Sequence, residues 1–327
     1  MNTKDFFFKL QWWVKEHLFA CRTTLKNQVV MEYHLPDGYK DFSIHPCVRY
    51  IPQGINGHKW WMVLTPYQNY DVTKENIELY YGIDDKEGNP PTKWKFVREV
   101  CGKHSQGYNS DPNLLFENGE LWIIWREWET ENLPPKSPIC FIRSCKTCDG
   151  VTFSEPQALA YNEYKGFAMS ADSMMCPTLI TFKGKLILYG SYYEFSPHLN
   201  PIGLSYYVQS GALFKMKHMI PNKKLWFDMW HFDMFILDNY IYQIITGQFG
   251  NAIYLGRSTD GINFEYSKKP LHCNILFIKK NYYYKPTAQV FNNKLYVFYP
   301  CKISHGIVRI VRREISLRVF RNLFFYS

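Results

Sequence analysis

The sequence predicts an all-β protein, a five-bladed β-propeller, on the basis of three observations. A strand–turn–strand pattern occurs five times in the 327 residues, and its copies lie roughly 54 to 66 residues apart, which leaves room for one four-stranded blade each. The strands alternate apolar and polar residues with a period of two, and no useful stretch of helical period interrupts residues 41–318. Propellers of four to eight blades are known, so five copies predict a ring of five.

The five copies begin in the same way. Each starts with a polar residue or a cysteine, usually followed by proline, and continues into an apolar strand. A turn containing Gly, Asn or Asp then leads into a second apolar strand, and these residues tolerate the positive φ of a tight hairpin turn. The copies are HPCVRYIPQGINGHKWWMVLTPY from His45, DPNLLFENGELWIIWRE from Asp111, CPTLITFKGKLILYGSY from Cys176, HFDMFILDNYIYQIIT from His231 and KPTAQVFNNKLYVFYP from Lys285.

A second pattern recurs at the outer end of the blades. Residues 144–153 read SCKTCDGVTF, and residues 258–264 read STDGINF. In such a turn the aspartate accepts hydrogen bonds from the turn backbone, the glycine supplies positive φ, and the aromatic ring fills the gap between strands. We therefore interpret Asp149 and Asp260 as structural residues and not as catalytic ones.

The composition provides for a large core and narrows the possible functions. Hydrophobic residues make up 46% and aromatic residues 18%, and the net charge of +9 is spread along the chain. No motif that reads RNA or DNA accompanies this charge, so we expect no nucleic-acid partner. Among nine cysteines, Cys145 and Cys148 form a CxxC without the second pair that a structural zinc site requires, which favours reduced thiols.

The first 40 residues differ from the rest of the chain. Charged residues interrupt their apolar run, which argues against a signal peptide, and no window reaches the roughly 20 apolar residues of a transmembrane helix. We expect residues 1–40 to pack on or close a propeller formed by residues 41–327; an amphipathic helix on a membrane surface is the alternative. We expect the protein to be cytoplasmic.

The starts of the five inner strands converge at one mouth of a propeller's central channel. Convergent polar groups from different strands are the form that an active site takes. The chain resembles the five-bladed propeller glycoside hydrolases of the arabinanase, β-xylosidase and invertase type. The resemblance covers most of residues 41–300 and is carried by HPCVRY with WWMVLTPY, YNSDPNLLFENGELWIIWRE, WHFDMF and RSTDGINF.

The resemblance implies a carbohydrate substrate and three carboxylates in the channel. These are a base or nucleophile on the first blade, a helper Asp on the second and a general acid Glu on the third. Asp111 matches the second-blade position. The first-blade position holds His45 instead of Asp, and the third-blade strand begins with Cys176 and offers no Glu. The expected mechanism therefore has to use other residues.

The candidates that replace the two missing carboxylates lie near the inner strands. Asp233 follows His231 by two residues, so both side chains point to the same side of the strand, and a histidine with a carboxylate partner can act as a general acid. Arg126 is suited either to clamping a substrate or to pairing with a neighbouring acid. The expected catalytic residues are Asp111, Asp233, His231 and Asp172, and the expected substrate-binding residues are His45, Arg49, Arg126, Trp230, Lys285 and Glu75.

The function hypothesis is a glycoside hydrolase-like protein that acts on an oligo- or polysaccharide at the central channel. The alternative, motivated by the missing carboxylates, is a catalytically silent propeller that binds a glycan or a protein partner. A sialidase-like site would require three arginines at the mouth, and only Arg49 and Arg126 lie near it. No cofactor is expected, and an axial calcium or sodium ion is left open.

Overall fold

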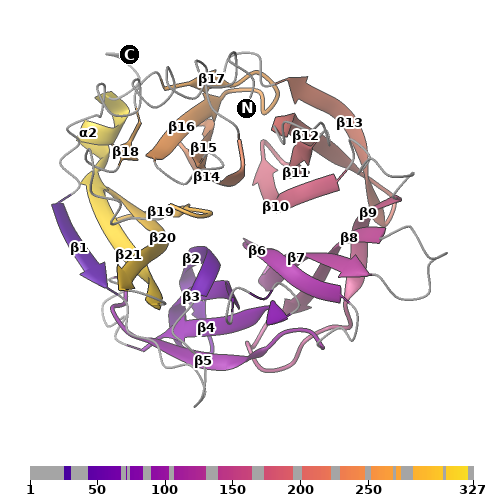
Figure 1. Cartoon of the computed structure of the whole chain (residues 1–327), viewed down its shortest axis with the longest axis horizontal. Helices are drawn as coiled ribbons and strands as arrows, with labels where there is room; N and C mark the ends of the chain where they lie inside the picture. Colours follow the sequence, from indigo (N-terminus) through magenta and orange to yellow (C-terminus); the bar gives the residue numbers. More distant parts are fainter. Residues whose placement is uncertain are drawn as a thin grey trace.

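Five antiparallel sheets surround a central axis (Figure 1), which confirms the predicted five-bladed β-propeller. The computed structural model describes residues 26–30, 43–67, 71, 74–83, 90–102, 107–129, 139–163, 173–193, 201–221, 229–246, 252–267, 270–273, 283–304 and 307–322. Within these ranges, no helix has the length and apolar character that a membrane span requires.

In the first four blades the strands follow one another outward in chain order. The first blade contains β2 (Ser43–Ile55), β3 (His58–Pro66), β4 (Glu78–Gly82) and β5 (Trp94–Glu99), and the second contains β6 (Gly107–Glu117), β7 (Glu120–Glu129), β8 (Ile139–Thr147) and β9 (Gln157–Glu163). The third contains β10 (Ser173–Phe182), β11 (Lys185–Tyr193), β12 (Pro201–Ser210) and β13 (Leu213–Pro221), and the fourth contains β14 (His231–Leu237), β15 (Tyr240–Thr246), β16 (Ala252–Ser258), β17 (Glu265–Tyr266) and β18 (His272–Cys273).

The fifth blade combines strands from both ends of the chain. Its strands are β19 (Thr287–Phe291), β20 (Lys294–Ser304), β21 (Ile307–Ser316) and, outermost, β1 (Lys26–Val30). The antiparallel pairing of β1 with β21 closes the ring by backbone hydrogen bonds between the two ends of the chain. A short helix, α2 (Leu317–Asn322), follows β21. Apart from β1, the segment 1–40 lies outside the described residues.

Large apolar side chains pack between neighbouring blades. Trp61 of the first blade and Trp125 of the second lie in one buried cluster. Trp60 of the first blade and Phe298 of the fifth lie in another, so the ring is also closed by apolar packing. An aromatic side chain buries about 150–250 Å² on folding, and these contacts therefore stabilise the arrangement of blades around the axis.

The inner strands begin with an unusual backbone conformation. His45, Asp111, Cys176 and Lys285 have positive φ, between 47° and 56°, and a proline follows each of them. In β2, β6 and β10 the strand register shifts at this point, which is the signature of a β-bulge. Bulges re-aim side chains and are frequent next to active sites. His231, which no proline follows, starts β14 in regular register.

The two outer turns have the hydrogen bonds that a structural role requires. Asp149 Oδ1 accepts hydrogen bonds from the backbone N–H groups of Val151 and Thr152, both at 2.8 Å. Asp260 Oδ1 accepts the equivalent pair from two residues of its own turn at 2.8 and 2.7 Å. Both aspartates therefore order the outer strand connections and lie on the turns, away from the inner strands.

Gly150 lies where two blades approach each other so closely that a side chain at this position would clash. A Cβ atom on Gly150 would lie 2.4 Å from Cη2 of the buried Trp61, whereas Gly184, with the same φ of 72°, has open space around it. We expect both alanine variants to lose about 1–2 kcal/mol of unfolding free energy from backbone strain. Gly150→Ala should lose about 1–3 kcal/mol more from overpacking. Urea unfolding measures both values, and equal losses would contradict the prediction.

Candidate active site

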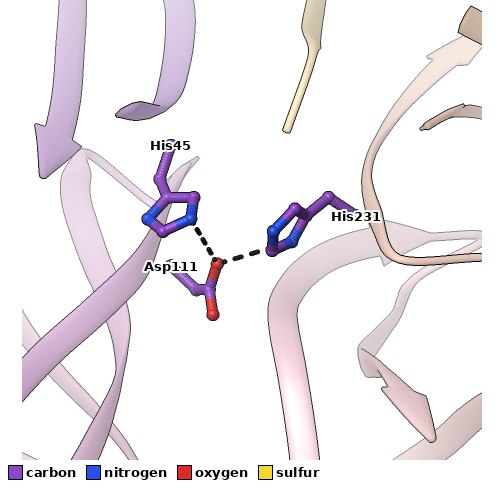
Figure 2. Close-up of side chains that lie close together, drawn as sticks. All are labelled: His45, Asp111 and His231. Atoms are coloured by element: carbon purple, nitrogen blue, oxygen red, sulfur yellow. Dashed lines mark ion pairs between the residues drawn. The ribbon is translucent and has the colours of Figure 1, made fainter. Parts of the chain in front are cut away.

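The residues that begin the inner strands form a polar cluster at the axis. His45, Asp111 and His231 come from three different blades, and their side chains point toward one another (Figure 2). Asp111 Oδ1 lies 3.4 Å from His45 Nε2 and 3.7 Å from His231 Nδ1. All three side chains are buried. The fold thus brings the imidazoles of His45 and His231, which are far from Asp111 in the sequence, close to one oxygen of its carboxylate.

The other oxygen of the Asp111 carboxylate contacts an arginine. Arg126 Nη2 lies 3.1 Å from Asp111 Oδ2, and the Arg126 guanidinium also lies over the rings of Tyr108 and Trp128. Burial alone would raise the pKa of Asp111, but the neighbouring histidines, Arg126 and Lys285 outweigh it and hold the pKa well below its usual range. Asp111 is therefore an ionised carboxylate at the centre of the site.

Both histidines of the cluster are neutral imidazoles at neutral pH. Burial lowers the pKa of His45 to about 3, and Asp111 opposes this only in part. Burial also lowers the pKa of His231 well below its usual range, with a further contribution from the positive charges around it. Neutral imidazoles cannot donate a proton as imidazolium ions do, but their unprotonated ring nitrogens can accept a hydrogen bond or bind a metal ion.

A second carboxyl group lies beside the cluster. Glu75 precedes β4, is 7% exposed, and forms a side-chain hydrogen bond with Ser110. The Ser110 hydroxyl in turn lies 3.3 Å from His45 Nδ1. Burial, with a smaller contribution from the negative charge of Asp111, raises the pKa of Glu75 to about 8. The cluster thus combines a carboxyl group whose pKa is lowered, Asp111, with one whose pKa is raised, Glu75.

Lys285 and Cys176, which also begin copies of the repeat, complete the surroundings of Asp111. Together with His45, Asp111 and His231 they are called the first ring. Lys285 is fully buried, and its Nζ donates a hydrogen bond of 2.6 Å to the carbonyl oxygen of Pro112. Cys176 Sγ lies 3.5 Å from Asp111 Oδ1 and contacts His231 Nδ1. Burial raises the pKa of the Cys176 thiol well above its usual range, which leaves it protonated and unsuited to nucleophilic attack.

Aromatic rings flank the two histidines. The Tyr284 ring centroid lies 5.0 Å from that of His45 and 4.2 Å from that of His231. Trp230 is half-buried, and its Nε1 lies 3.5 Å from the Tyr284 hydroxyl. These rings restrict the orientation of both imidazoles, and the accessible part of Trp230 lies next to the site.

A second ring of side chains lies two residues further along each inner strand. Two residues advance a strand by about 6.5–7 Å, so this ring is one layer deeper in the channel than the first. Its members are all buried, and they are Cys47, Asn113, Thr178, Asp233 and Thr287.

Asp233 has its carboxylate fully engaged in this second ring. Arg49 donates from Nη2 to Oδ1 at 2.7 Å and from Nη1 to Oδ2 at 2.9 Å. Asn113 Nδ2 donates to Oδ1 at 3.0 Å, and the Thr287 hydroxyl donates to Oδ2. Burial would raise the pKa of Asp233, but Arg49 lowers it below its ordinary value. These four residues join the first, second, fourth and fifth blades across the axis.

The structure separates the sequence candidates into two groups. The first lies together around Asp111, and it consists of His45, His231, Arg126, Lys285, Trp230 and Glu75. The second is Asp233 with Arg49, one layer deeper. Asp172 lies outside the described residues. Sequence reasoning missed Ser110, Asn113 and Thr287; the recurring X-Pro-x start, which places the third residue of each copy on the axis, would have indicated the last two.

Comparison with known proteins identifies the fold. No family model matches the sequence, and no curated protein matches it either. Among solved structures, an N-acetylgalactosamine deacetylase from F. plautii in complex with blood group B trisaccharide is similar, with a TM-score of 0.69 and 15% identity over 91% of this chain and 97% of the other. A family 117 glycoside hydrolase from Zobellia galactanivorans has a TM-score of 0.59 and 12% identity over 89% and 90%.

A third similar structure is a GH43 enzyme from Xanthomonas citri complexed with xylose. Its TM-score is 0.60, with 10% identity over 88% of this chain and 90% of the other. The likeness confirms the fold resemblance to five-bladed propeller glycoside hydrolases that the sequence indicated. One fold supports many chemistries, so the activity has to be argued from the site itself.

Proposed function

We propose that this protein is a hydrolase that cleaves glycosidic bonds of an oligo- or polysaccharide at the mouth of its central channel. The observation that carries the proposal is a pair of buried carboxyl groups in one cluster: Asp111, which contacts His45, and Glu75, which is linked to His45 through Ser110. Glycoside hydrolysis requires one carboxylic acid and one carboxylate in the same site, with pKa values pushed apart by their environments. The sugar-bound structures of the same fold support a carbohydrate substrate.

Each carboxyl group has one role in the proposed reaction. Glu75 donates its proton to the leaving oxygen as the bond from that oxygen to the sugar carbon breaks. Asp111 orients the attacking water and accepts its proton while the water oxygen bonds to the carbon. Glu75 Oε2 suits this role because it is buried and makes no hydrogen bond to any described residue. The half-buried Trp230 provides an apolar face for a sugar ring.

We assign Asp233 and Arg49 a structural role beneath the site. Both oxygens of the Asp233 carboxylate already accept hydrogen bonds from protein donors. A carboxylate with short hydrogen bonds to both oxygens is poorly placed to exchange a proton with substrate. Asp111 differs, because its Oδ1 contacts with His45, Cys176 and His231 are 3.4–3.7 Å long. The proposal therefore gives Asp233 no catalytic role and Arg49 no contact with substrate. Both residues instead close the channel beneath the site, and we call this layer the channel floor.

Replacing Glu75 with glutamine is expected to lower kcat by about 10²–10⁴-fold, because an amide cannot donate the proton. In the wild-type protein, the rate should fall as the pH rises through about 8, since only the protonated Glu75 is active and its pKa is raised to that value. Release of sugar from an oligosaccharide panel, followed by mass spectrometry at several pH values, measures both effects.

The matched control is Glu78→Gln, which removes a second buried carboxyl group of the same segment. Glu78 accepts a hydrogen bond from Tyr80. The Glu78→Gln variant therefore tests whether loss of any buried carboxyl group in this segment is enough to lower kcat. A Glu75→Gln variant that retains wild-type kcat and pH dependence would refute the proton-donor role. Glycan binding by the wild-type protein without any product would favour the silent-propeller alternative instead.

A further inference from the structure

Three side chains at the axis each offer one ligand atom to a common point. One atom each from His45, Asp111 and His231 lie within 4.8 Å of one another, and all three residues are buried. We infer that these three residues bind one divalent transition-metal ion of the Zn²⁺ or Co²⁺ class. The binding can be tested without any substrate, whereas its consequence for turnover rests on the proposed function.

The distances fit ligands around an ion better than hydrogen bonds. Ligand atoms about 2.0–2.2 Å from a tetrahedral ion lie roughly 3.3–3.6 Å from one another. The two distances from Asp111 Oδ1 are 3.4 Å, to His45, and 3.7 Å, to His231. Nitrogen–oxygen hydrogen bonds are usually about 2.7–3.2 Å long. His45 Nε2 is buried and makes no hydrogen bond to the part of the chain that the structure describes.

The surroundings hold one imidazole in the orientation that a metal ligand needs. The Ser110 hydroxyl lies 3.3 Å from His45 Nδ1, which leaves Nε2 directed at Asp111. Metal-binding histidines usually hold their second nitrogen in a contact of this kind. The ring of Tyr284 packs against both histidines and restricts their rotation.

The donor set selects the kind of ion. Two of the three donors are imidazole nitrogens, which suit zinc and neighbouring transition metals, whereas calcium and magnesium take oxygen ligands. The axial calcium or sodium ion that the sequence left open does not fit these donors. The two cations nearby have other partners, because Arg126 contacts Asp111 Oδ2 and Lys285 donates to the Pro112 carbonyl. Asp111 Oδ1 faces the two histidines and the Cys176 thiol.

An ion held by three protein ligands keeps a position for water. This is the arrangement of catalytic zinc sites, in which the ion lowers the pKa of the bound water to about 7. Glu75 is linked to the proposed ligand His45 through Ser110. Such a site would supply the attacking nucleophile without the first-blade aspartate and third-blade glutamate that related hydrolases carry.

The experiment measures metal binding to the chelator-treated full chain. Calorimetry with Zn²⁺, metal analysis after dialysis, and the visible spectrum of Co²⁺ should each show one ion per chain. His45→Ala and His231→Ala should each weaken Zn²⁺ binding by more than about 100-fold, since even loss of an outer partner costs 10–100-fold. His58→Ala, at the turn between β2 and β3 where His58 stacks on Tyr81, is the matched control and should bind normally.

The wild-type result decides the inference even where a variant does not fold. Absence of stoichiometric Zn²⁺ and Co²⁺, or binding of Ca²⁺ in their place, would overturn it. Turnover that survives removal of all metal would leave the proposed function standing and refute a part of the ion in the reaction, whereas the binding itself is decided by the Zn²⁺ and Co²⁺ titrations. Bound metal with no cleavage of any glycan, or with release of acetate from N-acetylated sugars alone, would refute the proposed function and leave the metal site intact.

Discussion

Replacing Asp111 with asparagine is expected to reduce kcat for glycan cleavage by about 10²–10⁴-fold. The amide has nearly the same shape as the carboxylate but carries no charge, so it can neither accept a proton from water nor serve as the anionic ligand between His45 and His231. Initial rates of sugar release at substrate saturation measure this effect. The substrate affinity should change less than the rate, since the substitution preserves the size of the side chain.

The same substitution also changes stability, and a second variant separates the two effects. Asp111→Asn leaves the buried Arg126 without its anion, which costs about 3–5 kcal/mol of unfolding free energy. Replacing both residues, as Asp111→Asn with Arg126→Met, removes the unpaired charge and should restore much of this stability. The double variant should nevertheless remain inactive. A double variant that folds and cleaves glycan at the wild-type rate would show that Asp111 is not catalytic.

The fold was predictable because its signals are local. Each hairpin turn requires positive φ, and the sequence supplies suitable residues at the positions where the structure has it, such as Asn118 and Gly119. Each X-Pro start marks an inner strand, because a bulge and a positive φ recur there, as at Asp111 and Cys176. Five repeats of such local signals specify five blades even though the overall identity to known propellers is low.

The separation of the two layers at the axis was not predictable in the same way. His231 and Asp233 share one side of β14, so strand periodicity places both at the axis and cannot distinguish their roles. The difference comes from Arg49, which pairs with Asp233 across 184 residues of sequence. Likewise, Glu75 could be placed near the rim, but its raised pKa depends on burial by residues from several segments.

Loss of the Arg49–Asp233 pair is expected to lower stability as much as loss of the buried pair between Asp111 and Arg126. Arg49→Ala should lower the unfolding free energy by about 3–5 kcal/mol, because it leaves the Asp233 carboxylate buried without its cation. The control is Arg257→Ala, which breaks a 3.0 Å pair with Glu265, a residue whose side chain is 71% exposed, and should cost about 1 kcal/mol or less. Urea unfolding of both variants measures the difference.

The same experiment distinguishes a structural floor from a substrate clamp. If Arg49 supports the channel floor, Arg49→Ala should lose stability, and a double-mutant cycle with Asp233→Ala should give a coupling of about 1–3 kcal/mol, because the two residues share one buried pair. If Arg49 instead binds substrate, its loss should raise KM and leave the unfolding curve unchanged. Four blades contribute to the pair and its hydrogen bonds, so loss of the pair should lower stability first. Activity should fall only if that loss shifts the residues of the first ring around Asp111.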